Sequence, residues 1–91
     1  MRLRYKARAL RDLERIHSYI SQFDPAAAKT VILRIERSIG RLSTLPMSGR
    51  PGVKGARLLV VPGVPYVVVH RVGEDVVDII AVLHTARRRR S

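Results

Sequence analysis

Four side chains in the second half of the chain are of types that move protons or stabilise negative charge: Tyr66, His70, His84 and Arg87. Cleavage of RNA through its 2′-hydroxyl needs one group to take a proton, one to stabilise charge on the phosphate and one to protonate the leaving oxygen. Tyrosine, histidine and arginine can supply these roles, so the four residues are the catalytic candidates if the chain is a ribonuclease. The histidines lack the spacing of a compact metal motif and cysteine is absent, so we predict neither a metal site nor a cofactor.

Positive charge is the dominant property of the chain, whose net charge is +11. Without the arginine run Arg87–Arg90 the net charge is still +7 (11 − 4), so the charge is not confined to that run. A field of this sign attracts nucleic acid or an acidic protein and makes binding sensitive to salt. The basic tail, residues 87–91, is either a solvated end or part of a contact surface.

The length of 91 residues leaves room for one domain, which we expect to span residues 1–91. Apolar residues make up 46% of the chain and aromatic residues only 4%, which predicts an aliphatic core. The longest apolar stretch, Leu58–Val69, is interrupted by prolines and a glycine and is too short to span a bilayer. The N-terminus lacks the apolar segment of a signal peptide, so the expected compartment is the cytoplasm, with no membrane partner.

The elements that would position the candidate residues begin with a short strand over Arg2–Lys6, where charged and bulkier residues alternate. A helix is predicted over Ala7–Gln22, with an apolar face made of Leu10, Leu13, Ile16, His17 and Ile20. On that face we expect His17 to be a hydrogen-bonded core residue. The opposite, polar face carries Arg8, Arg11, Asp12, Arg15 and Gln22.

A second helix is predicted to begin at Pro25, with Asp24 as its N-cap, and to run to about Leu42. The short joint between the two helices predicts an antiparallel αα-hairpin. A loop over residues 46–55 follows, and then three strands, Arg57–Val61, Tyr66–Val72 and Val76–His84, with tight turns between them. The order β-α-α-β-β-β predicts an α+β fold in which an antiparallel sheet packs against the helical hairpin.

Two segments then point to a family. The junction of the helical and β halves reads Leu45-Pro46-Met47-Ser48-Gly49-Arg50-Pro51-Gly52, and the last strand ends in Val82-Leu83-His84-Thr85-Ala86-Arg87. This succession resembles the ParE branch of the RelE/ParE toxin superfamily over nearly the whole chain. The resemblance implies a toxin of a type II toxin–antitoxin system that poisons DNA gyrase, arrests growth and contributes to plasmid stabilisation, without chemistry of its own.

The same resemblance implies partners. A cognate ParD-like antitoxin would be acidic, dimeric and DNA-binding, and would carry the complex to operator DNA. Its flexible C-terminal segment would fold on the toxin and bury apolar surface there. By analogy we place antitoxin binding at the helical groove and the sheet edge: Ile16, Tyr19, Ile20, Val31, Arg57 and Arg71. The residues expected to face gyrase or its DNA are His84, Arg87, Arg88, Arg89 and Arg90.

The chain departs from the RelE branch, whose members cut mRNA on the ribosome. It has no lysine in the strand Arg57–Val61, no arginine beside Tyr66 and no tyrosine after it. A ribosome-dependent mRNA endonuclease is therefore the alternative function rather than the first one. A further alternative is a non-toxic member that only binds an antitoxin or nucleic acid. For Tyr66 itself, we expect packing at the rim of the sheet rather than a catalytic role.

Overall fold

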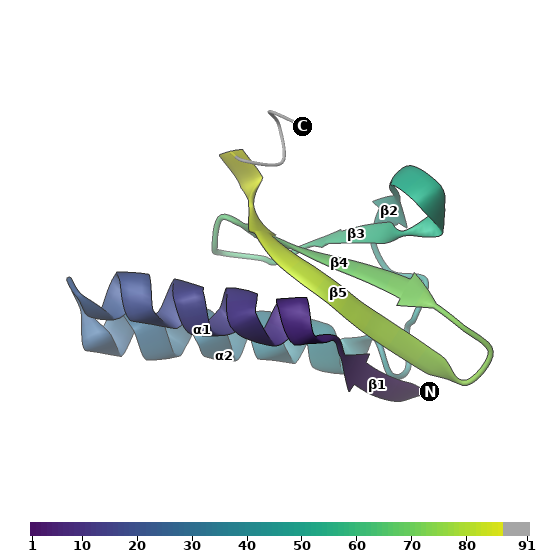
Figure 1. Ribbon diagram of the computed structural model, residues 1–91, viewed down its shortest axis with the longest axis horizontal. Coiled ribbons are helices and arrows are strands. Elements are labelled where there is room, and N and C mark those ends of the chain that lie inside the picture. Colours follow the sequence, from purple (N-terminus) through teal and green to yellow (C-terminus); the bar gives the residue numbers. More distant parts are fainter. Residues whose placement is uncertain (87–91) are drawn as a thin grey trace.

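Two helices cover one face of a five-stranded sheet in the computed structural model, which describes residues 1–86 (Figure 1). This architecture confirms the predicted α+β class and the predicted order of the main elements. The elements are β1 (Arg2–Tyr5), α1 (Ala7–Ser21), α2 (Pro25–Arg41), β2 (Arg50–Pro51), a 3-10 helix (Val53–Gly55), β3 (Arg57–Val60), β4 (Tyr66–Val72) and β5 (Val76–His84).

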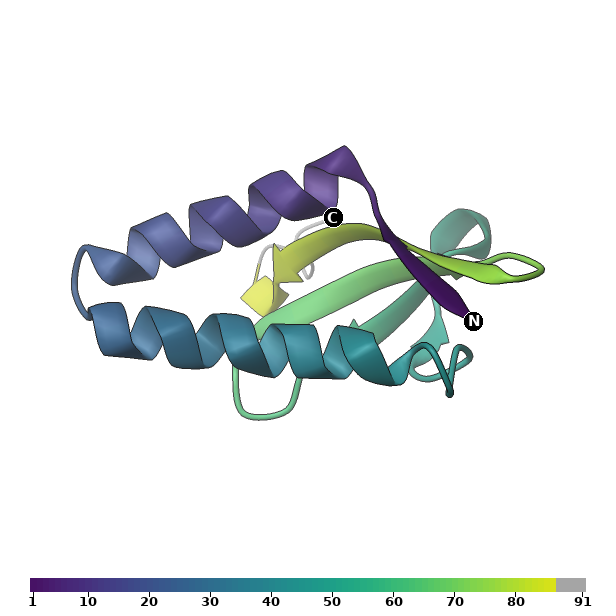
Figure 2. The ribbon, with the colours of Figure 1, turned by 90° about the horizontal axis from the view of Figure 1, so that it is seen from below.

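The helical hairpin forms where the sequence places it, and Figure 2 shows its two helices side by side. The carboxylate of Asp24 accepts a hydrogen bond from the Ala27 N–H at 3.0 Å, which caps α2. Pro25 occupies the first turn of α2, where its missing N–H costs nothing. Within residues 1–86, no helix is long and apolar enough to cross a membrane.

The sheet has the order β1-β5-β4-β3-β2 and is mixed rather than wholly antiparallel. Strands β3, β4 and β5 form the predicted antiparallel meander, but β1 lies parallel to β5, with Leu3 opposite Val77. The pairing of the first strand with the last depends on a contact across more than seventy residues, which local patterns do not report. The predicted loop 46–55 also contains β2, which pairs with β3.

The core lies between the sheet and the helices and is aliphatic, as predicted. Fully buried side chains of α2 and its C-cap meet buried side chains of β4 and β5: Ile35, Ile39, Leu42, Val68, Val77 and Ile79. A bulge between Val69 and His70 changes the register of β4 against β5. Beyond it, His70 lies opposite Ile79 and is also fully buried.

The buried face of α1 differs from the predicted one. Ala9, Asp12 and Leu13 are buried, whereas Leu10 is 49% exposed and His17 is exposed. The prediction that His17 is a core residue is therefore wrong; its Nδ1 lies 3.5 Å from the Ser21 hydroxyl at the surface. The physical reason is Asp12, whose burial is made possible by a hydrogen bond and two ion pairs. A hydropathy pattern places an aspartate on the exposed face. The predicted apolar face is therefore rotated about the axis of α1 relative to the face that is buried.

Candidate functional site

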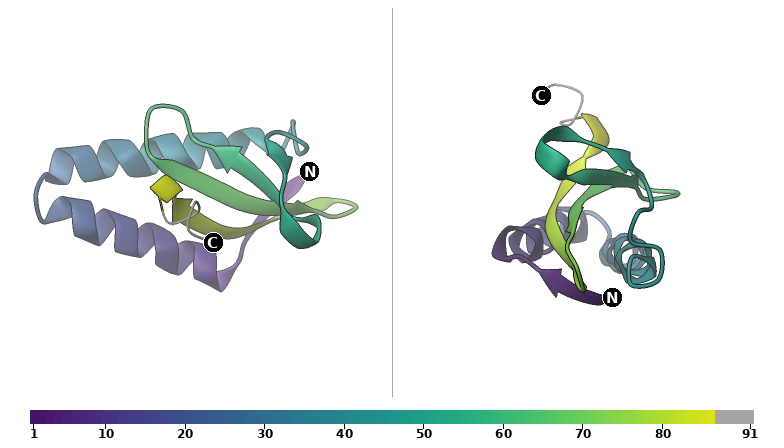
Figure 3. Two further views of the ribbon diagram at one scale, coloured as in Figure 1. Left: turned by 90° about the horizontal axis from the view of Figure 1, so that it is seen from above. Right: turned by 90° about the vertical axis from the view of Figure 1, so that its right-hand side faces the viewer.

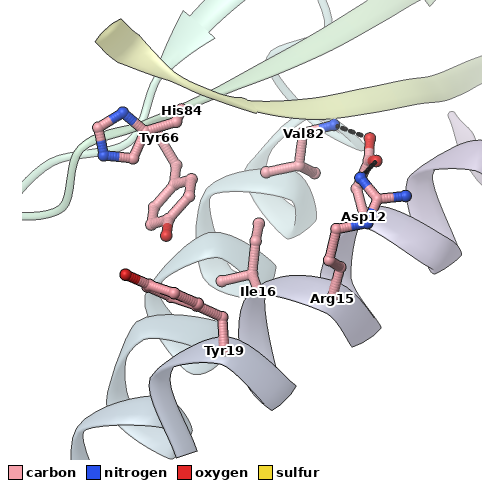
Figure 4. Close-up of a pocket in the computed structure, with 7 residues that line it drawn as sticks. All are labelled: Asp12, Arg15, Ile16, Tyr19, Tyr66, Val82 and His84. Carbon is pink, nitrogen blue, oxygen red and sulfur yellow. Dashed lines mark hydrogen bonds and ion pairs between the residues drawn. The ribbon is translucent and has the colours of Figure 1, made fainter. Parts of the chain in front are cut away.

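A pocket opens where α1 and β5 diverge. The pairing of β1 with β5 ends at Ile79, after which α1 runs beside β5 in its place. Figure 1 shows β5 rising away from the helices toward its C-terminal end. The space left, which we call the α1–β5 pocket, has a volume of about 310 Å³. Its lining, drawn in Figure 4, comprises Asp12, Arg15, Ile16, Tyr19, Tyr66, Val82 and His84.

Asp12 joins the helix to the sheet at the floor of this pocket. Its Oδ2 accepts a hydrogen bond from the backbone N–H of Val82 at 2.9 Å, and its side chain is only 3% exposed. Arg8 and Arg15 form ion pairs with its carboxylate at 3.5 and 3.4 Å. Because β1 no longer pairs with β5 at this point, the Val82 N–H would have no acceptor at the buried edge of β5 without Asp12.

Sequence reasoning missed Asp12, although a signal was available. The arginines lie four residues before and three residues after the aspartate, the spacings at which helical side chains meet. Two arginines at these spacings can offset the charge of an aspartate that is buried. Arg15 was placed on the polar face, and its side chain is 64% exposed, so it remains accessible at the rim of the pocket.

Tyr66 and His84 are the two catalytic candidates that the fold brings together. They are cross-strand neighbours on β4 and β5, with ring centroids 5.4 Å apart in an edge-to-face arrangement. Burial raises the pKa of the Tyr66 hydroxyl. The Nδ1 of His84 accepts a hydrogen bond from the Ala86 N–H at 3.1 Å, so the proton of a neutral His84 ring resides on Nε2.

His70 lies at the far end of β4 and faces the core. Its Nε2 donates a hydrogen bond to the carbonyl oxygen of Pro46 at 3.1 Å, and its Nδ1 is buried without a partner in residues 1–86. Burial lowers the pKa of the imidazole, an effect that the nearby Arg57 reinforces. The structure therefore does not join His70 to Tyr66 and His84, and the remaining ribonuclease candidate, Arg87, lies outside the described residues.

The buried imidazole makes a pH-dependent contribution to stability. Since the pKa of His70 is lower in the fold than in the unfolded chain, protonation favours unfolding, and stability should fall as the pH drops below the ordinary histidine pKa. The slope can reach about 1.4 kcal/mol per pH unit. We expect His70→Gln, whose amide can donate to Pro46, to flatten this fall in urea titrations between pH 7 and pH 5. The exposed-site control His17→Gln should keep the wild-type slope; equal slopes for all three proteins would contradict the assignment.

The residues predicted to bind an antitoxin divide between two places. Ile16 and Tyr19 line the α1–β5 pocket, and the half-buried Ile20 and Val31 lie along the helical hairpin. Arg57 and Arg71 lie near the His70 end of β4, where their guanidinium groups donate to backbone carbonyls of the loop after α2. The residues Arg88, Arg89 and Arg90, predicted to face the target, lie outside the described residues together with Arg87.

The rim of the pocket continues into an exposed aromatic pair. Tyr19 is 62% exposed and Phe23 is 74% exposed, with their ring centroids 5.5 Å apart. Figure 4 shows Tyr19 and Tyr66 facing each other across the pocket from α1 and β4. An apolar hollow with an arginine and a histidine at its edge is suited to an apolar side chain from a partner with acidic neighbours. Residues 1–86 contain no cluster of acidic and histidine side chains that could hold a metal ion.

Comparisons with known proteins find a toxin family and two similar toxins. Residues 3–89 match the family described as the ParE toxin of the type II toxin–antitoxin system parDE. The chain is 43% identical over 84 residues to Y4kP, a toxin candidate of Sinorhizobium fredii, covering 91% of this chain and 86% of that protein. It is 41% identical over 81 residues to toxin RelE2 of Caulobacter vibrioides, covering 88% of this chain and 90% of that protein.

A solved structure is also similar. A chain of the chromosomal ParDE TA system from P. aeruginosa superimposes with a TM-score of 0.82 at 25% sequence identity, covering 92% of this chain and 95% of that one. The order of elements, the helical hairpin on one face of the sheet and the family match over residues 3–89 lead to the same conclusion. The chain belongs to the ParE toxin family of type II toxin–antitoxin systems.

Proposed function

We propose that this toxin acts by binding DNA gyrase and trapping its cleaved-DNA state, without catalysis of its own. The observation that carries this proposal is the separation of His70 from the Tyr66–His84 pair, which leaves the candidate acid–base residues of the described chain divided. His70 is buried at one end of β4 and bonded to Pro46, whereas Tyr66 is at the other end with a hydroxyl whose pKa is raised by burial. A ligand that binds one state of an enzyme better than another shifts the population toward it, and this requires no chemistry from the ligand.

The same proposal includes neutralisation by a cognate antitoxin of the ParD kind, acidic and dimeric, which would also carry the complex to operator DNA. Its support is the α1–β5 pocket, where Ile16, Tyr19 and Tyr66 provide apolar surface and Arg15 provides an exposed cation. The net charge of +11 favours an acidic partner. A flexible antitoxin segment would fold on this surface and bury the exposed Tyr19. The compartment would be the cytoplasm, where gyrase meets its DNA.

The test is a plasmid assay with purified toxin, gyrase and ATP, in which DNA is treated with detergent and protease before electrophoresis. We expect linear DNA to accumulate with toxin concentration and to be absent when gyrase is omitted. Truncation after Ala86, which removes four arginines, should reduce the yield and its dependence on salt if the tail faces the target. Normal supercoiling without linear DNA, from a protein that still arrests growth, would refute gyrase as the target.

Ribosome-dependent mRNA cleavage is the second candidate, because one relative carries the name RelE2 and because Tyr66 and His84 are neighbours. It predicts toxin-dependent cuts in ribosome-bound mRNA that disappear in Tyr66→Phe. A non-toxic member of the family would arrest no growth when expressed alone.

A further inference from the structure

The loop between α2 and β3 is held by side chains from the sheet at three points. His70 donates to the carbonyl of Pro46, Arg57 donates to the carbonyls of Met47 and Gly49, and Arg71 donates to the carbonyl of Lys54. These bonds have lengths between 2.8 and 3.2 Å. We call residues 45–55 the clamped loop. A loop fixed in this way presents its side chains in one arrangement and loses little entropy on binding.

The backbone of the clamped loop is strained at Lys54. This residue has φ 55° and ψ 40°, and it is the one non-glycine residue in the left-handed region within residues 1–86. For a residue with a long side chain this conformation is uncommon and costs about 1 kcal/mol or more. The Arg71 bond to the Lys54 carbonyl, at 2.8 Å, holds it there. Strain that is held by the surrounding structure is a recurrent feature of functional segments.

Apolar side chains on this loop face outward. Val53 is 82% exposed, the highest value among the exposed large hydrophobic residues of the described chain, and Leu45 and Met47 are each 60% exposed. Met47 also lines a hollow of about 340 Å³ together with Pro51, Gly52, Gly55, Ala56, Arg57 and Val72. Exposed apolar residues on a fixed backbone are typical of the centre of a protein–protein contact.

The charge of this part of the chain has one sign. Between Glu36 and Glu74 the sequence contains six lysines and arginines and no acidic residue. Two of them, Arg50 and Lys54, are exposed on the clamped loop itself. Across residues 1–86 the ion pairs are made by Arg4, Arg8 and Arg15, all outside this segment. An acidic surface on a partner would therefore complement the loop.

We propose that the clamped loop is the surface by which the toxin docks on an acidic patch of a folded target protein, separately from the antitoxin pocket. This inference rests on the proposed function, in which the target is gyrase. A protein rather than a nucleic acid is favoured because the most exposed side chain, Val53, is aliphatic. A preformed surface suits a folded target, whereas a flexible antitoxin can adapt to the toxin.

The two surfaces are far enough apart to act independently. Tyr66 lines the α1–β5 pocket, and Arg71, five residues along β4, clamps the loop, so strand geometry separates them by about 16 Å. The right-hand view of Figure 3 shows the edge of the sheet formed by β2, together with the 3-10 helix, at the end of the molecule away from the two helices.

The test compares three variants in the gyrase assay. Val53→Glu introduces a charge that repels an acidic partner, and Lys54→Asn removes a cation while keeping a residue that tolerates the left-handed region. Leu33→Glu, at a 43% exposed site on α2, is the matched control for adding a glutamate. We expect Val53→Glu to raise the toxin concentration for half-maximal linear DNA by roughly 30-fold, as for a hot-spot residue. Lys54→Asn should raise it by about tenfold. Leu33→Glu should behave as wild type, and none of the three should unfold below the wild-type temperature.

Each other outcome overturns a specific statement. If Val53→Glu matches Leu33→Glu, the clamped loop is not a docking surface. Loss of activity in Lys54→Asn alone would likewise exclude an apolar contact at Val53 and overturn docking of a protein on this loop. If wild-type toxin produces no linear DNA, gyrase is not the target, and the same variants are then compared for growth arrest in cells. Arrest that requires Val53 would support the docking surface with another target, and arrest that does not would overturn it.

Discussion

Asp12→Ala is expected to lower the free energy of unfolding by about 2–3 kcal/mol, which for a chain of this size corresponds to roughly 10–20 °C in melting temperature. The substitution leaves the Val82 N–H without its 2.9 Å acceptor at a buried edge of β5. It also leaves Arg8 and Arg15 without the carboxylate they share. Since the same bond ties α1 to β5, the α1–β5 pocket should lose its shape.

Asp12→Asn is the matched control, because its side-chain oxygen can still accept from Val82 while its charge is gone. The arginines are more than half exposed, so each ion pair contributes only about 0.3–0.5 kcal/mol. We therefore expect the asparagine variant to lose about half as much stability as the alanine variant or less, measured by chemical denaturation. Should Asp12→Ala cost under ~0.5 kcal/mol, Asp12 would not be the link between helix and sheet.

Gly49→Ala is expected to destabilise the fold by at least ~2 kcal/mol. Gly49 has φ 86°, in the left-handed region, and a Cβ there would overlap the carbonyl oxygen of Leu58 on β3. Relief requires the clamped loop to move away from the strand, which breaks the 3.2 Å bond from Arg57 to the Gly49 carbonyl. Thermal unfolding measures the loss, and the gyrase assay reports whether docking weakens with it.

Gly40→Ala is the contrasting variant. Gly40 lies in α2, and a Cβ at this position meets no atom within 4 Å. Alanine in an exposed helical position should stabilise the protein by about 0.5–1 kcal/mol. The substitution of glycine by alanine is thus expected to lower the free energy of unfolding at Gly49 and to raise it at Gly40. A loss of stability at both would show that the close approach of Gly49 to β3 is not the cause.

Much of the fold follows from local patterns. The start of α2 was predictable from Asp24 and Pro25, and the strands Tyr66–Val72 and Val76–His84 were predicted with the limits that the structure shows. These features depend on residues close together in the chain. The turn between these strands did not by itself place Tyr66 beside His84, because the bulge between Val69 and His70 shifts the register by one residue before the pairing reaches Tyr66.

Local patterns in the amino-acid sequence account for the two helices, the four longer strands, the aliphatic core and the resemblance to the family. The tertiary structure alone decided that β1 joins β5 in parallel, that Asp12 is buried at a strand edge and that His70 is remote from His84. It also decided that Arg57 and Arg71 hold the clamped loop. The physical reason is common to all four. Each depends on which backbone groups, distant in the sequence, lack a hydrogen-bond partner. Buried donors and acceptors are then satisfied by the groups that folding brings within hydrogen-bond distance.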